Sequence, residues 1–204
     1  KNFRSNQLQG SEYRHHVGFT GYLDTVGLRG TEVICQLASK LPECAFHIVG
    51  GQKIAVEYWK NYGKDHNQNQ NLFFYGHRNP SEIPYFLDCF DIVLAPLQFK
   101  PSSRAPTGEN MSPLKLPQYM AYKKAIVASD LPAPREVLDG DRTALLVKCD
   151  DIEAWADAIK FLIHNPEKRS KMGLEAFQEY QKGYTPAARI KSILGKFSQS
   201  NTLS

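Results

Sequence analysis

The feature of this sequence that most constrains its fold is a series of short apolar runs separated by segments with helical periodicity. Each run has the length of a strand and is apolar almost throughout, as is typical of a strand covered by helices on both faces. Because these runs alternate with helices, the pattern predicts a doubly wound α/β domain, Rossmann-like, with a mainly parallel sheet. The predicted strands cover residues 17–23, 45–49, 72–75, 91–97, 125–129 and 144–147.

The ends of the chain differ from this alternating centre. Residues 1–16 are polar and have no clear period, so we assign them to a linker from a preceding domain. Residues 17–183 then form the folded domain, and residues 184–204 form a C-terminal helix and tail. The first strand is expected to begin at Val17, directly after His15 and His16.

Helices are predicted wherever apolar residues recur at helical spacing. Two loops between them are rich in polar residues or proline: we expect residues 63–71 to be solvated surface and residues 98–111 to be mobile. Pro117 favours a late start or a kink in the helix that contains it. The predicted helices cover residues 32–40, 54–62, 80–90, 113–122, 132–138, 151–164 and 166–183, with a last helix from Thr185.

Glycines lie near or directly after the ends of three of the predicted strands, at Gly21, Gly50-Gly51 and Gly76. Ligands in open parallel sheets bind beyond the carboxyl ends of the strands, where glycine lets the backbone approach a phosphate. Glycines after strands also serve ordinary turns, so both interpretations of Gly50-Gly51 stay open.

The helix that follows the fourth strand is predicted to present one face to a ligand. Lys115 and Gln118 project together near its start, where unpaired N–H groups favour an anion. The packed face is predicted to hold Pro113, Leu116, Pro117, Met120 and Ala121, and the binding face Ser112, Lys115, Gln118, Tyr119 and Tyr122.

The run SPLKLPQYMAYKKAIVASDLPAPREVLDGDRTALLV, residues 112–147, resembles the signature of the carboxy-terminal, nucleotide-sugar-binding domain of GT-B glycosyltransferases, most closely family 4. That family carries two glutamates eight positions apart, and the matching positions here are Asn110 and Gln118. The spacing of Lys115 and Gln118 is also similar, more weakly, to the xanthan-type glucuronosyltransferases, another GT-B group.

The resemblance implies a donor site for a UDP-sugar or GDP-sugar, with no cofactor and no metal. In this interpretation Gly21 lies against the diphosphate, Arg29 replaces a phosphate-binding lysine, and Gly76 with His77 meets the nucleobase. Asn110 would face the transferred sugar, and Gln118 would bind the ribose. The complete set of implied donor contacts is Gly21, Arg29, Gly50, Gly51, Gly76, His77, Asn110, Pro113, Leu114, Lys115 and Gln118.

The resemblance also implies partners that lie outside the domain. It implies an N-terminal acceptor-binding domain, a sugar acceptor in polysaccharide or glycolipid synthesis, and a lipid-linked acceptor at a membrane surface. The chain would be cytoplasmic or peripheral to the inner face of the membrane. The amides that replace both glutamates favour an alternative, a pseudoenzyme or nucleotide-binding module without catalysis. A sugar-nucleotide epimerase or a phosphorylase shares the architecture, but the SPLKL helix resembles neither well.

Composition narrows the function classes further. A net charge of +4 with dispersed Lys and Arg argues against a nucleic-acid binder. Four cysteines without close-spaced pairs predict reduced thiols, and the absence of a long apolar stretch or signal peptide predicts a soluble chain. We interpret Asp139-Gly140-Asp141 as a turn rather than a metal motif, and His47 as a packed histidine rather than a general base.

Overall fold

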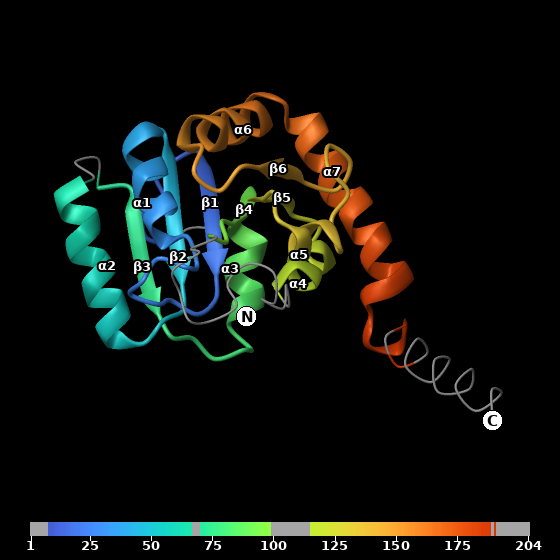
Figure 1. Ribbon diagram of the computed structural model, residues 1–204, viewed down its shortest axis with the longest axis horizontal. Helices are drawn as coiled ribbons and strands as arrows, with labels where there is room; N and C mark the ends of the chain where they lie inside the picture. The colour runs from blue at the N-terminus through green and yellow to red at the C-terminus, as the bar shows by residue number, and fades with distance from the viewer. Residues whose placement is uncertain (1–7, 67–69, 99–114, 189, 191–204) are drawn as a thin grey trace.

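Six strands form one sheet, and helices cover both of its faces (Figure 1). A computed structural model describes residues 8–66, 70–98, 115–188 and 190. The strand order is β3-β2-β1-β4-β5-β6, and every neighbouring pair is parallel. The predicted doubly wound α/β fold is therefore confirmed. The strands are β1 His15–Thr20, β2 Cys44–Val49, β3 Leu72–Gly76, β4 Ile92–Ala95, β5 Ala125–Ser129 and β6 Leu145–Val147.

The helices divide between the two faces of the sheet. Side chains of α1, α2 and α6 belong to one hydrophobic cluster, those of α3 and α4 to a second, and α7 contributes to both. The last elements of the described chain are helical, as predicted: α6 and α7 are followed by a π-helical turn, η2. Most of the last helix, predicted from Thr185, lies outside the described residues. The elements are α1 Thr31–Lys40, α2 Lys53–His66, α3 Ile83–Cys89, α4 Lys115–Ala121, α5 Pro132–Arg135, α6 Ile152–His164, α7 Pro166–Glu179 and η2 Tyr180–Tyr184.

Strand β4 is apolar at every position because each face of the sheet has its own core. Its Ile92 and Leu94 belong to the first cluster, while Val93 and Ala95 belong to the second. Successive side chains of a strand point to opposite faces, so a strand between two helical layers is largely apolar, and polar residues in it, such as His16 and His47, have buried partners. This is the physical origin of the continuous apolar runs in the sequence.

The order of the strands creates a crevice between β1 and β4. The chain proceeds outward from β1 to β3 and then crosses back to place β4 on the other side of β1. Loops that leave the carboxyl ends of β1 and β4 therefore diverge, which opens a crevice where ligands of doubly wound sheets bind.

The first strand begins earlier than predicted, because His15 and His16 belong to β1. His16 is buried, and its N–H donates to Asp91 Oδ2 at 2.9 Å. Residues from Leu8 onward, predicted as part of a linker, also contact the domain: Leu8 is buried and the Gln9 N–H donates to the Tyr75 hydroxyl at 3.1 Å. The backbone N–H groups of Gln9 and His16 therefore have hydrogen-bond partners inside the domain, which the composition alone does not reveal.

The amide-rich loop was also predicted incorrectly in part. Helix α2 continues to His66, four residues beyond the predicted end at Tyr62, and Asn71 is fully buried rather than solvated. The Asn71 Nδ2 atom donates toward the carbonyls of Ala38, Leu41 and Cys44 at 2.8 to 3.0 Å. One asparagine therefore satisfies carbonyls at the end of α1 and the start of β2, a structural role for a residue with a loop-like composition.

His47 is packed in the core, as predicted, and takes part in a buried chain of hydrogen bonds. Its Nε2 atom lies 3.0 Å from His16 Nδ1, and its Nδ1 atom lies 3.0 Å from the Tyr75 hydroxyl. Because the Tyr75 hydroxyl already accepts the Gln9 N–H, it can donate to a neutral His47, which then donates to His16. The neutral form of His47 satisfies every member of this chain.

We predict that this histidine makes the domain sensitive to acid. Burial, and secondarily the charge of His16, lowers the pKa of His47 to about 3. Below the unfolded value of 6.5 the unfolded chain takes up a proton that the folded chain does not, so stability falls as pH falls towards 3. The free energy of unfolding should be about 2 kcal/mol lower at pH 5 than above pH 6.5 from His47 alone.

Denaturant unfolding at several pH values measures this slope. A His47→Phe variant should have a shallower slope between pH 6.5 and 5, whereas a matched change at the exposed His164, at the end of α6, should leave the slope unaltered. An identical slope in the wild type and His47→Phe would exclude the buried chain as its source.

Candidate functional site

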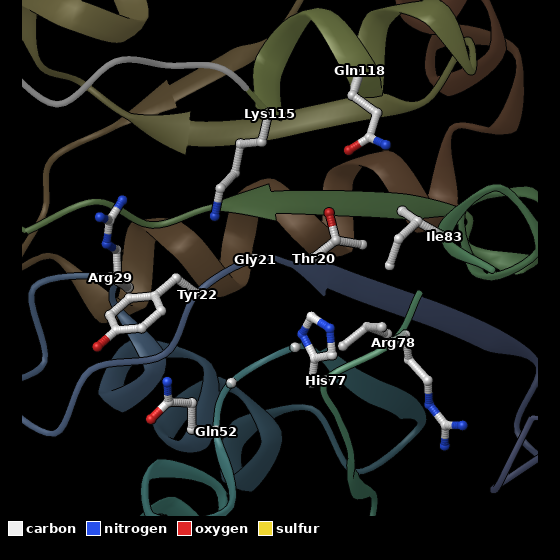
Figure 2. A pocket seen from close by; sticks show the side chains of 13 residues that line it. Thr20, Gly21, Tyr22, Arg29, Gln52, His77, Arg78, Ile83, Lys115 and Gln118 are labelled. Atoms are coloured by element: carbon white, nitrogen blue, oxygen red, sulfur yellow. The ribbon is translucent and has the colours of Figure 1, made fainter. Parts of the chain in front are cut away.

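A cavity of about 770 Å³ lies at the carboxyl ends of β1, β2 and β3, bordered by the loop before α1 and by α4 (Figure 2). Its described lining includes three basic side chains and no carboxylate, so its potential is positive and favours an anion. The lining residues are Thr20, Gly21, Tyr22, Arg29, Val49, Gly50, Gly51, Gln52, His77, Arg78, Ile83, Lys115 and Gln118.

The glycines of the lining join the strand ends to one another. The Gly21 N–H donates to Val49 O at 2.9 Å, and the Gly50 N–H donates to Gly76 O at 2.8 Å. Gly50 has a φ of +127°, and a Cβ atom there would lie 2.0 Å from Gly21 O. The close approach of two backbones therefore requires Gly50, whatever the ligand.

The other predicted glycines are placed nearby. Gly51 also lines the main cavity, and its missing Cβ leaves room for the Leu23 side chain. Gly76 lies in an adjoining cavity of about 340 Å³, which shares His77 with the main one. The same glycines therefore allow close backbone packing at the strand ends and line the two cavities.

Lys115 is the most unusual side chain of the site. It extends from α4 toward Gly21 (Figure 2), and its Nζ atom is buried without a hydrogen-bond partner among the described residues. The amine lies 3.8 Å from the centroid of the Phe19 ring, and a Cβ on Gly21 would lie 2.6 Å from it. Burial, and then the nearby charge of Arg29, lowers the pKa of Lys115 to about 7.

Burying a polar group without a hydrogen-bond partner costs about 1 to 3 kcal/mol, and the contact of the amine with the Phe19 ring offsets part of this cost. An anion in the cavity would supply a partner and stabilise the charged form. The described surroundings of Lys115 are therefore suited to an anionic ligand.

Arg29 and Gln118 complete the polar part of this region. Arg29, from the loop before α1, is half-buried and lies on the Lys115 side of the cavity (Figure 2). Its Cζ atom lies 5.9 Å from the centroid of the Tyr22 ring. Gln118 projects from α4 toward the cavity, three residues after Lys115 (Figure 2). The predicted pairing of Lys115 and Gln118 on one helix face is therefore present.

Tyr119 was wrongly predicted to belong to the binding surface, although it lies one turn after Lys115 on α4. It is fully buried in the second hydrophobic cluster, and its hydroxyl binds the backbone of Thr20. Leu116 and Met120 are buried as predicted, and Pro117 falls in the first turn of α4, where proline is tolerated. A tyrosine is compatible with either face, so its position needed tertiary context.

Several predicted contacts lie outside the described residues. These are Asn110, Pro113 and Leu114, together with Ser112 and nearly all of the loop at residues 98–111. His77 is described; it is exposed and lines both cavities.

Six lining residues are absent from the predicted set of contacts: Thr20, Tyr22, Val49, Gln52, Arg78 and Ile83. Five of them are recoverable from sequence, because they adjoin predicted residues at strand ends: Thr20 and Tyr22 flank Gly21, Val49 precedes Gly50, Gln52 follows Gly51 and Arg78 follows His77. Ile83 comes from the start of α3 and carries no comparable signal.

The acidic residues Asp139 and Asp141 have structural roles. The Asp139-Gly140-Asp141 segment forms a turn, in which Asp139 accepts from Arg142 Nε at 2.6 Å and Asp141 has a φ of +62°. No cluster of three or more metal-ligating side chains occurs in the part of the chain that the structure describes. Within the same part, no helix is long and apolar enough to cross a bilayer.

Solved structures with the same fold include a domain of a glycosyl transferase and a protein solved with UDP-glucose. The C-terminal domain of LpcC, a group 1 glycosyl transferase of Francisella tularensis, has a TM-score of 0.70 at 20% identity, with 90% of this chain and 93% of that chain covered. HepE of Anabaena, solved with UDP-glucose, has a TM-score of 0.78 at 16% identity, covering 96% of this chain and 51% of that one. Sucrose-phosphate synthase of Thermosynechococcus elongatus has a TM-score of 0.77 at 18% identity, covering 93% and 46%.

The chain therefore spans about half the length of the latter two proteins. Comparison with curated proteins gave no match. The family model described as glycosyl transferases group 1 matches residues 29–179, which include most of the sheet, Arg29, Lys115 and Gln118. With its fold, its cationic crevice and this match in agreement, the chain belongs to the group 1 glycosyl transferases.

Proposed function

We propose that the cavity binds the diphosphate of a nucleoside-diphosphate sugar and that the chain is the donor-binding half of a family 4-like GT-B glycosyltransferase. The observation that carries this proposal is Lys115, whose buried amine faces a cavity with cationic walls and has no hydrogen-bond partner within the described part of the chain. The shared spacing of Lys115 and Gln118 also supports a relation to the xanthan-type glucuronosyltransferases.

The arrangement supports departure of a nucleoside diphosphate. When the sugar is transferred to an acceptor hydroxyl, negative charge develops on the leaving diphosphate, and fixed cations stabilise it. Arg29 and Lys115 would provide these cations without a metal, and no other cofactor is proposed. Gln118, which can donate and accept, would bind ribose hydroxyls, and His77 with Gly76 would contact the base.

Further contacts and partners belong to the same proposal. Asn110 would face the sugar, and Pro113 and Leu114 would border the diphosphate. A UDP-sugar is favoured as donor by the UDP-glucose in HepE, and a GDP-sugar is the alternative. An N-terminal acceptor domain, a lipid-linked acceptor in polysaccharide or glycolipid synthesis, and a cytoplasmic place at the membrane surface follow from the family resemblance.

A titration series tests the donor site. UDP, UMP and uridine, with GDP, GMP and guanosine in parallel, should bind with affinity that falls from diphosphate to nucleoside, because the cations hold phosphate. Removing divalent ions with a chelator should leave the affinity for the diphosphate unchanged. Equal affinity for uridine and UDP, or dependence on a metal, would contradict the proposed site.

We predict that residues 1–204 alone bind donor and do not transfer sugar. A GT-B active site lies between two domains, and the described cavity contains no carboxylate and only His77 as a histidine. An assay with radiolabelled UDP- and GDP-sugars, against lipid-linked and soluble acceptors, measures transfer. Robust transfer would show that the chain is a complete enzyme, whereas donor hydrolysis without transfer would be consistent with a missing acceptor domain.

A further inference from the structure

The Tyr119 hydroxyl joins helix α4 to the end of strand β1. It accepts the Thr20 N–H at 2.9 Å, lies 3.3 Å from Thr20 Oγ1, and donates to Thr20 O at 3.3 Å. The ring is fully buried in the second hydrophobic cluster. A phenylalanine would fill the same volume, so packing alone does not account for the hydroxyl.

The hydrogen bond from the Thr20 N–H to the Tyr119 hydroxyl takes the place of a hydrogen bond to strand β4. Residues Val17 and Gly18 of β1 pair with β4, but this ladder stops before Thr20 because the two strands diverge. The Thr20 N–H therefore has no β4 carbonyl to bind, and a buried N–H without an acceptor is costly. The tyrosine hydroxyl of α4 fills this place at the topological switch point.

The same joint sets the position of Lys115. Lys115 and Tyr119 are four residues apart, so they lie on one face of α4, one turn from each other. Tyr119 holds Thr20, and the Lys115 amine lies over Phe19 and against Gly21, the residues on either side of Thr20. The hydrogen bonds of Tyr119 hold its turn of α4 at the end of β1. They thereby also hold the preceding turn, which carries Lys115, beside the cavity.

We propose that Tyr119 is a positioning residue for donor binding, which acts through Lys115 by holding α4 at the end of β1. This inference rests on the proposed function. A helix free to shift would carry the amine away from the diphosphate, because charge-assisted hydrogen bonds need a separation near 3 Å.

A double-mutant cycle with UDP tests the proposal, or with GDP if that nucleotide binds more tightly. Tyr119→Phe should weaken binding by about fivefold or more in the wild-type background. In the Lys115→Met background the same change should have little effect, since the residue through which it acts is absent. Tyr58→Phe, at an exposed tyrosine of α2, is the control and should leave affinity unchanged.

The cycle separates positioning from a general loss of structure. Additive effects of the two substitutions, or unchanged affinity in Tyr119→Phe, would overturn the inference while the proposed function stands. If Tyr119→Phe does not fold, hydrogen exchange of the Thr20 amide in the wild type decides: the nucleotide should slow it, and unaltered exchange would overturn the inference. No nucleotide binding by the wild type would overturn the proposed function and this inference together.

Discussion

Replacing Lys115 with methionine is expected to weaken binding of UDP-sugar or GDP-sugar by roughly 5- to 150-fold, which corresponds to about 1 to 3 kcal/mol for a charge-assisted hydrogen bond. Methionine keeps the apolar stem that lies against Phe19 and removes only the amine. Calorimetric titration measures the affinity, and Lys160→Met, at an exposed lysine of α6, is the matched control.

The same substitution should have the opposite effect on the empty domain. Because the Lys115 amine is buried and no described residue is its hydrogen-bond partner, its removal should maintain or increase the free energy of unfolding, by up to about 2 kcal/mol. Weaker binding together with a loss of stability would indicate that Lys115 supports the fold instead of the ligand.

The Lys115 pKa also gives binding a characteristic pH dependence. Burial lowers the pKa of the free amine to about 7, and a bound diphosphate raises it by favouring the ammonium form. Affinity should therefore be level below pH 7 and should fall above it by up to about tenfold per pH unit. A nucleotide sugar is the suitable probe, since its esterified diphosphate does not titrate near neutrality, and Lys115→Met should abolish the dependence.

A Gly50→Ala substitution is expected to have the second large effect, on both stability and binding. The new methyl group would lie 2.0 Å from the Gly21 carbonyl, and the φ of +127° is one that alanine rarely adopts. We expect a loss of about 2 to 4 kcal/mol in the free energy of unfolding and at least roughly tenfold in nucleotide affinity, because Gly21 would be displaced.

Gly76→Ala separates backbone strain from steric contact. Gly76 also has a positive φ, of +67°, but no atom of the described residues beyond its chain neighbours lies within 4 Å of the position of its Cβ. The expected loss is therefore limited to about 1 to 2 kcal/mol for a left-handed residue. Equal losses in the two variants would contradict the close approach of Gly50 to Gly21.

The fold was predictable because its strongest signal is local. The apolar run at residues 125–128 has no polar position, and all of its residues are buried between two helical layers. The helix predicted over residues 151–164 is present as α6, and Asp151 caps its start by accepting the Ala154 N–H at 2.9 Å. Signals of this kind depend on neighbouring residues only, so the sequence contains them in full.

Features that depend on distant partners were not predictable in the same way. Tyr119 and Asn71 are polar residues whose partners lie about 30 or more positions away, at Thr20 in one case and at Ala38, Leu41 and Cys44 in the other. The interpretation of each from composition was therefore wrong. Gly50 shows an intermediate case: its position was identified, while the backbone contact that requires it became visible only in three dimensions.

A crystal structure of the chain with bound UDP or GDP is the most direct test of the central claim, that the cavity beneath α4 is a diphosphate site. A phosphate oxygen should lie about 3 Å from Lys115 Nζ, with Arg29 on the same group and the base toward His77. A nucleotide that binds in solution but occupies a place away from Lys115 in the crystal would contradict the account.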